Sequence, residues 1–131
     1  MPEAAFVDLP SDNDAGGVDQ AKRVLVVEDE AFIAFDLADM LEQLGYEDVV
    51  ICNSYGSAEQ AMQSEEFEIA VFDLNLDGKL STPLIDRAAA KGMKVVIASG
   101  YEVETIPSSD PSTPRIVKPY DIATLRNALA S

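Results

Sequence analysis

The chain has 131 residues, of which 47% are hydrophobic, and a formal net charge of -15 at pH 7. That length and apolar content suit one domain with a real core and leave little room for a second. The negative charge opposes binding to nucleic acid and to anionic membranes, and the apolar runs are too short to span a bilayer. Because the N-terminus is acidic where a signal peptide would be basic, we expect a cytoplasmic protein.

Two residue counts exclude further classes of chemistry. The chain contains no histidine, so Ser-His-Asp and Cys-His catalysis and histidine-ligated zinc are ruled out. The single cysteine, Cys52, cannot form an internal disulfide, and its place in the apolar run VVIC predicts a buried thiol.

The N-terminal segment differs in composition from the rest of the chain. Residues 1–21 mix Pro, Gly and acidic side chains with little periodicity, which predicts a flexible acidic leader. The folded domain is expected to cover residues 22–131. Within it, apolar runs rich in β-branched residues predict five strands: RVLVV (23–27), DVVIC (48–52), EIAVF (68–72), KVVIA (94–98) and RIV (115–117).

About five helices are expected to alternate with these strands. The first has apolar residues at helical spacing from Ile33 to Leu44, acidic residues Asp29 or Glu30 at its start, and Gly45 as its stop. Others are predicted over 57–63, from Thr82 or Pro83 to Lys91, and over 121–130. Between residues 99 and 114 three prolines break the pattern, so the fourth helix should be short, irregular or absent.

Short apolar strands separated by helices are typical of a parallel sheet covered on both faces. The predicted fold class is therefore α/β, a doubly wound five-stranded parallel sheet with the flavodoxin-like order 2-1-3-4-5. In such sheets ligands bind at the carboxyl ends of the strands, where the strand order reverses.

Polar residues stand at those carboxyl ends. Glu28 and Asp29 end strand one and Asp73 ends strand three, and these strands are expected to be neighbours. Three crowded carboxylates repel one another, but a hard divalent cation such as Mg2+ makes the arrangement tolerable. Ser99 after strand four adds a hydroxyl, and Lys118 after strand five adds a positive charge. Together they predict a site for a phosphoryl group on Asp73.

The stretch AVFDLNLDGKLSTPL (70–84) has rival interpretations. Asp73, Asn75 and Asp77 ahead of Gly78 begin the calcium-loop pattern of an EF-hand, but the twelfth position is Leu84 rather than a bidentate Glu. A phosphatase with an aspartate nucleophile commonly needs a second carboxylic acid where this chain has Asn75. Taken singly, each acidic residue could also be part of a solvated charge run or, for Asp73, a turn cap.

Four motifs, in order from about residue 23 to residue 129, resemble those of a response-regulator receiver domain. VLVVEDE resembles its acid-pair motif, AVFDLNLDG its phosphoacceptor motif, VVIASGY its hydroxyl-bearing strand and IVKPYD its lysine-proline motif. The resemblance implies a receiver of a two-component or phosphorelay system. Such a protein accepts a phosphoryl group from a histidine kinase or phosphotransfer protein, and is not a conventional enzyme.

The resemblance also implies a role for each site residue. Asp73 is the phosphoacceptor, Asp29 binds Mg2+ directly, Glu28 acts mostly through water, and the carbonyl of Asn75 completes the protein ligands. Ser99 takes the place usually held by Thr or Ser.

The remaining implied features concern strand five and its readout. Lys118 contacts the phosphoryl oxygens, and the Lys118-Pro119 peptide bond should be cis. Receivers usually carry Tyr or Phe three residues before that lysine, where this chain has Arg115. Tyr101 is the candidate to replace that aromatic reporter.

Within the family, Ile97-Ala98-Ser99-Gly100-Tyr101 and the KPY that follows are similar to the alphaproteobacterial "FAT GUY" receivers, named for Phe-Ala-Thr-Gly-Tyr. Such proteins are often single-domain and take phosphate from kinases of the HWE or HisKA2 type, some in general stress signalling. Because only 13 residues follow Lys118, no output domain is expected. A downstream protein would read the phosphorylated surface, or the chain would act as a phosphate sink. The alternative is a receiver-fold binding module that phosphorylation does not control.

Overall fold

Residues 22–100 and 113–130 are described by the structure, which is a computed structural model of the chain. The predicted leader (1–21), most of the proline-containing segment with its expected fourth helix, and Tyr101 lie outside the described residues. In chain order, the elements are β1 (Arg23–Val27), α1 (Ala31–Gln43), β2 (Asp48–Cys52), α2 (Tyr55–Ser64), β3 (Ile69–Asp73), β4 (Asn75–Leu76), β5 (Lys79–Leu80), α3 (Thr82–Ala90), β6 (Lys94–Ser99), β7 (Arg115–Val117) and α4 (Ile122–Ala130).

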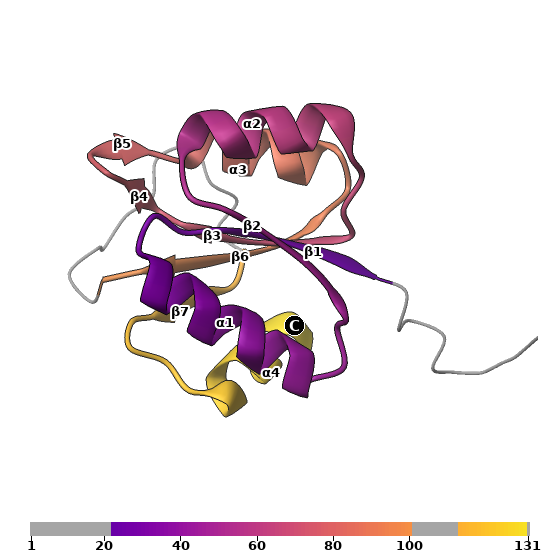
Figure 1. The fold of residues 1–131 in the computed structure, drawn as a ribbon, viewed down its shortest axis with the longest axis vertical. Coiled ribbons are helices and arrows are strands. Elements are labelled where there is room, and N and C mark those ends of the chain that lie inside the picture. The colour runs from indigo at the N-terminus through magenta and orange to yellow at the C-terminus, as the bar shows by residue number, and fades with distance from the viewer. Residues whose placement is uncertain (1–21, 101–112, 131) are drawn as a thin grey trace, which may run out of the picture.

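The five longest strands form one parallel sheet in the spatial order β2-β1-β3-β6-β7. Numbered among themselves in chain order, they read 2-1-3-4-5, so the predicted doubly wound α/β fold is confirmed. Figure 1 shows α2 and α3 on one face of the sheet and α1 and α4 on the other. None of the helices in the described ranges is long and apolar enough to cross a membrane.

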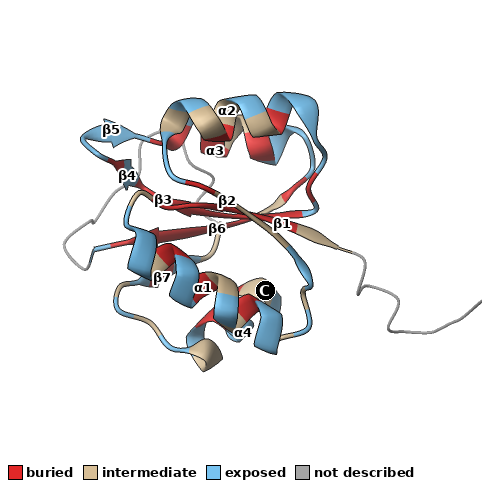
Figure 2. Ribbon diagram, viewed as in Figure 1, coloured by how far each residue is buried: buried red, intermediate tan, exposed pale blue. Residues whose placement is uncertain are grey.

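Side chains of the central strands alternate between two apolar clusters. On β1, Leu25 and Val27 pack into the cluster that includes α2 and α3, whereas Val24 and Val26 pack into the cluster that includes α1 and α4. Successive side chains of a strand point to opposite faces, so a strand covered on both faces is apolar throughout. Figure 2 shows the buried sheet between the buried inner sides of the two helical layers. Cys52 is buried in the first cluster, as predicted.

The helices begin and end close to their predicted bounds. α2 begins at Tyr55, two residues earlier than predicted, because Ser54 and Ser57 form a reciprocal capping box. Glu30 precedes α1 without a side-chain cap, and Gly45 adopts φ 103° just after its C-terminal end. Pro83 lies in the first turn of α3, as predicted.

A two-stranded hairpin, β4–β5, follows β3 and was not predicted. Its two-residue turn, Asp77-Gly78, has positive φ at both positions (53° and 88°), which is the conformation of a type I′ turn. The Lys79 ammonium lies 3.9 Å from the centre of the Tyr55 ring and so ties the hairpin to α2. An Asp-Gly pair is a strong hairpin signal, but here it also fits the calcium-loop pattern and the phosphoacceptor motif, which do not predict a hairpin.

Candidate functional site

Strand register brings the predicted site residues to one edge of the sheet. Val27 pairs with Phe72, so Glu28 and Asp73 follow at the same level on neighbouring strands. On the next strand Asp73 pairs with Ala98, which places Ser99 one residue beyond. Ser99 in turn pairs with Val117, and Lys118 comes next. The predicted convergence of these strand ends is therefore present.

Three carboxylates form the centre of this edge. Glu28 is 2% exposed and Asp73 is 8% exposed, while Asp29 is half-buried. One carboxylate oxygen from each of the three lies within 4.8 Å of the others, which is a spacing that a metal ion could bridge. Oxygen donors that carry several negative charges fit a hard cation such as Mg2+.

Lys118 supplies the positive charge of the cluster. Its Nζ lies 2.8 Å from Glu28 Oε1 and 3.2 Å from Asp73 Oδ2, and the lysine side chain is only 20% exposed. The Lys118 N–H donates to the Ser99 carbonyl (2.9 Å), which continues the ladder between β6 and β7. The Lys118-Pro119 peptide bond is cis, as predicted.

The pKa values of Asp73 and Lys118 follow from this crowding. Burial, and then the negative charge of Glu28, raise the pKa of Asp73 to about 7, although the positive charge of Lys118 opposes the shift. Burial tends to lower the pKa of Lys118, but its hydrogen bond to Glu28 and the attraction of Asp73 outweigh burial and raise it. Lys118 therefore stays charged, and without a cation the Asp73 carboxyl exchanges its proton near neutral pH.

The β4–β5 hairpin closes over the acidic cluster through backbone donors. The Asp77 N–H donates to Asp29 Oδ2 (2.9 Å), and the Asn75 N–H donates to Asp73 Oδ1 (3.3 Å). The side-chain oxygen of Asn75 accepts from the Gly78 N–H (2.8 Å) and braces the turn. The hairpin thus orients two of the three acids with main-chain groups.

The hairpin ladder also sets the direction of the Asn75 carbonyl. The Ser81 N–H donates to the Leu74 carbonyl (2.9 Å), so the adjacent Asn75–Leu80 pair is of the kind that makes no hydrogen bond across the ladder. The N–H and C=O of such a residue point away from the partner strand, and the Asn75 N–H does reach Asp73. The Asn75 carbonyl therefore lies on the side of the Asp73 carboxylate.

The two remaining predicted residues on β6 and β7 differ in setting. Ser99 is buried (5% exposed) at the carboxyl end of β6, beside the acidic cluster in register. Arg115 is exposed at the start of β7, where it pairs with Ile97. The other predicted switch residue, Tyr101, is outside the described residues.

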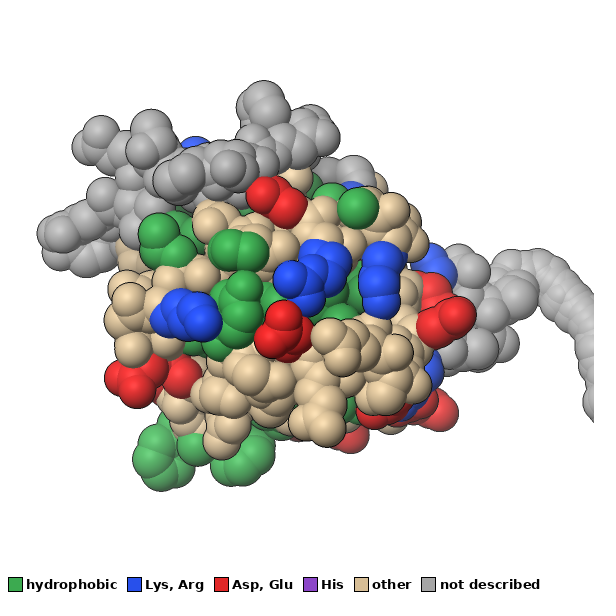
Figure 3. All heavy atoms as spheres, turned by 90° about the horizontal axis from the view of Figure 1, so that it is seen from above, with side chains coloured by type: hydrophobic (Ala, Val, Ile, Leu, Met, Phe, Trp, Pro, Cys, Tyr) green, Lys and Arg blue, Asp and Glu red, His purple; other side chains and the backbone are tan. Residues whose placement is uncertain are grey.

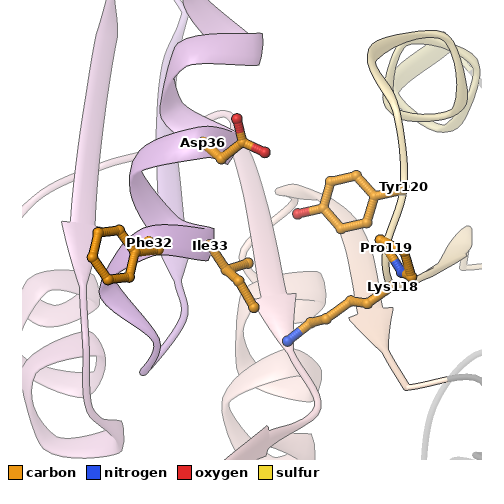
Figure 4. A pocket seen from close by; sticks show the side chains of 6 residues that line it. All are labelled: Phe32, Ile33, Asp36, Lys118, Pro119 and Tyr120. Atoms are coloured by element: carbon orange, nitrogen blue, oxygen red, sulfur yellow. The ribbon is translucent and has the colours of Figure 1, made fainter.

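A hollow of about 610 Å³ adjoins Lys118 and was not predicted. Three of its lining residues come from α1 and three from the loop between β7 and α4, as Figure 4 shows: Phe32, Ile33, Asp36, Lys118, Pro119 and Tyr120. Asp36 and Tyr120 project toward each other across it. Burial, together with the charges of Glu28 and Asp36, raises the pKa of Tyr120, so its phenol remains neutral.

Charge and apolar surface are unevenly distributed over the helices. Figure 3, which looks onto α2 and α3, shows basic and acidic side chains interspersed. By contrast, α1 (AFIAFDLADMLEQ) carries acidic residues and no Lys or Arg. It also exposes two aromatic side chains, Phe32 (87% exposed) and Phe35 (62% exposed). Phe32 also lines the hollow beside Lys118.

No protein-family model matches the chain, and no curated protein matches it. Solved structures do match. The chain is 30% identical to SdrG from Sphingomonas melonis Fr1, with a TM-score of 0.74, over 85% of this chain and 95% of that one. It is 27% identical to the response regulator receiver domain (CheY-like) from Methylobacillus flagellatus, with a TM-score of 0.73, over 84% of this chain and 97% of that one.

A third similar structure is that of the PhyR stress response regulator, at 26% identity and a TM-score of 0.71, over 83% of this chain and 43% of that one. The doubly wound sheet carries acidic residues and a lysine at one edge. Together with the similarity to these solved structures, this arrangement defines a signalling receiver. The chain belongs to the CheY-like response-regulator receiver family.

Removing the charge of Asp73 should change how stability depends on pH. Because the pKa of this carboxyl is raised from 3.8 to about 7, the folded state binds a proton more tightly than the unfolded state. Stability from this group is present below pH 4 and is lost as the pH rises to 7. In metal-free buffer, wild type should therefore lose about 2–3 kcal/mol of this stability between pH 5 and pH 8, whereas Asp73→Asn should not. The free energy of unfolding of Asp73→Asn minus that of wild type should rise by the same amount.

Urea unfolding with a chelator present measures this difference. Asp39→Asn, which removes an exposed carboxylate from α1, is the matched control for the loss of one negative charge. If the free energies of unfolding of Asp73→Asn and wild type differ by the same amount at pH 5 and at pH 8, Asp73 does not titrate in this range.

Proposed function

We propose that the protein is a stand-alone phosphoacceptor of a two-component or phosphorelay system. The observation that carries this proposal is the buried Asp73 carboxylate, which lies beside Glu28 and Asp29 and 3.2 Å from the ammonium of Lys118. In this proposal residues 22–131 form the receiver and residues 1–21 a leader. We also propose a place in stress signalling, which the similarity to the PhyR stress response regulator supports, and in the "FAT GUY" subfamily, which residues 97–101 resemble.

In the proposed transfer, a carboxylate oxygen of Asp73 attacks the phosphorus of a phosphohistidine in line with the bond that breaks. A P–O bond forms, the P–N bond breaks, and its electron pair returns to the imidazole nitrogen. Lys118 neutralises charge on the phosphoryl oxygens, and the Ser99 hydroxyl donates to one of them. Hydrolysis of the acyl phosphate then returns Asp73 to its resting state.

The same proposal assigns the metal ligands. A bound Mg2+ would neutralise charge on the phosphoryl group. Asp29, Asp73 and the carbonyl of Asn75 would hold it, with Glu28 acting through water. One observation supports this set, that the three carboxylate oxygens lie close together. The direction inferred for the Asn75 carbonyl from the hairpin pairing agrees with it.

We infer that the phosphodonor docks on α1. Receiver domains partner with histidine kinases, and here the proposed kinase is of the HWE or HisKA2 type. Phe32 and Phe35 expose apolar area next to the hollow that adjoins Lys118. A kinase helix on this surface would bring its phosphohistidine to the strand ends, because α1 begins only two residues after Asp29.

The proposed readout involves the loop after β6. Arg115 is exposed at the position where receivers usually carry an aromatic reporter, so the switch must use another residue. We propose that phosphorylation draws Ser99 toward Asp73 and repositions Tyr101. The surface formed by β6, this loop and β7 would then be read by a downstream protein.

Asp73→Asn should abolish labelling by a panel of phosphorylated histidine kinases, because the amide is not a nucleophile. Labelling of the wild type should require Mg2+, and millimolar Mg2+ should raise its melting temperature by relieving repulsion among the carboxylates. Undiminished labelling of Asp73→Asn would refute the assignment. A wild type that no kinase labels, but whose partner binding is intact, would favour the receiver-fold binding module.

Phe32→Ala should slow transfer from the cognate kinase at least about tenfold, since central aromatic contacts dominate docking energy. The rate with acetyl phosphate, which needs no docking surface, should not change. Leu80→Ala, which truncates an exposed apolar side chain on the hairpin, is the control. Equal loss with both phosphodonors would contradict docking at Phe32.

Beryllofluoride, a mimic of the phosphoryl group, should shift the NMR signals of residues 99–114 when it occupies Asp73. Tyr101→Ala should make partner binding independent of phosphorylation. If those signals do not move while Asp73 is occupied, the proposed readout is wrong.

A further inference from the structure

Ser81 is a fully buried polar residue at the junction of the hairpin and α3. It is 0% exposed, and its hydroxyl lies 2.6 Å from the carbonyl oxygen of Asp73 and 3.1 Å from that of Leu74. A buried hydroxyl destabilises a fold unless it is hydrogen-bonded, so these two contacts account for its presence. The shorter contact is to the residue proposed to accept the phosphoryl group.

Helix capping does not explain this serine. Ser81 stands at the position before the first turn of α3, where a serine side chain commonly accepts a hydrogen bond from the second or third helical N–H. Its side chain makes no such bond. A hydroxyl carries a single proton, and here the hydroxyl faces the carbonyl oxygens of two consecutive peptide bonds, Asp73–Leu74 and Leu74–Asn75.

The backbone around Asp73 is thereby held from several directions. The Leu74 N–H donates to the Ala98 carbonyl on β6 (3.0 Å), and the Leu74 carbonyl accepts from the Ser81 N–H (2.9 Å). The Ser81 hydroxyl adds the restraint on the Asp73 carbonyl. These bonds fix the rotation of the peptide plane that leaves Asp73. Because the Cβ atom of Asp73 is bonded to the same Cα atom, these restraints also limit where that side chain starts and so where its carboxylate can lie.

We propose that Ser81 is a positioning residue for the phosphoacceptor, an inference that rests on the proposed function. Its hydroxyl restrains the Asp73 peptide so that the carboxylate oxygen keeps the direction needed for in-line attack. Ser81 touches neither the phosphodonor nor the phosphoryl group and acts only through Asp73. Small errors in the direction of a reacting group reduce rates strongly, so the effect should appear in the rate of transfer.

The experiment compares Ser81→Ala with Ser54→Ala. Both changes remove the hydroxyl of a serine that stands just before a helix, but the Ser54 side chain caps α2 and contacts Ser57, whereas that of Ser81 contacts the Asp73 carbonyl. With acetyl phosphate and Mg2+, Ser81→Ala should be phosphorylated about tenfold more slowly than wild type, and Ser54→Ala at the wild-type rate. The carbonyl ¹³C signal of Asp73 should move in Ser81→Ala alone.

A conservative variant separates positioning from general loss of structure. Ser81→Cys keeps a side-chain donor, although the thiol is larger and donates more weakly than the hydroxyl, so its rate should lie between those of wild type and Ser81→Ala. It also serves if Ser81→Ala fails to fold. Wild-type rates in the Ser81 variants, or equal losses in Ser81→Ala and Ser54→Ala, would overturn the proposal. A wild type that takes no phosphoryl group would instead contradict the proposed function.

Discussion

The balance of charge between one half-buried lysine and two buried carboxylates governs the rest of this structure. Lys118 lies within 3.2 Å of both Glu28 and Asp73, and together these side chains bring more negative than positive charge to a poorly solvated edge. Unpaired charge in such a place costs several kcal/mol. The site is therefore poised to gain stability from an added cation, and the raised pKa of Asp73 shows the same imbalance in its metal-free form.

The sheet makes this concentration of charge possible. Parallel strands end at one edge, and the apolar side chains of β1 and β3 fill both core clusters up to Val27 and Phe72. The crowded carboxylates thus begin at the residues that follow these two positions. Packing supplies the stability that the polar edge lacks, so a change of charge at Asp73 can alter local geometry without loss of the sheet.

Much of this arrangement could be predicted from the sequence, because it depends on patterns that are local. The strands follow from apolar runs and the helices from helical spacing. The strand order is the one typical of a flavodoxin-like sheet, and the convergence of Glu28, Asp73 and Lys118 follows from that order. The hairpin was not predicted, because Asp77-Gly78 fits metal-ligand spacing as well as a two-residue turn. The contacts of Ser81 and the hollow beside Tyr120 depend on side-chain packing between distant segments, for which the sequence has no periodic signal.

The hairpin meets the acidic cluster with its main chain. Asp77 contributes its N–H to Asp29, and nothing in that contact requires the Asp77 carboxylate. What the turn does require is a residue that tolerates φ 53°, followed by one that tolerates φ 88°. Asparagine or glycine meets the first condition and glycine the second. Homologous chains are therefore free to exchange the acidic side chain at this turn, and a count of acidic residues would misjudge whether their sites are intact.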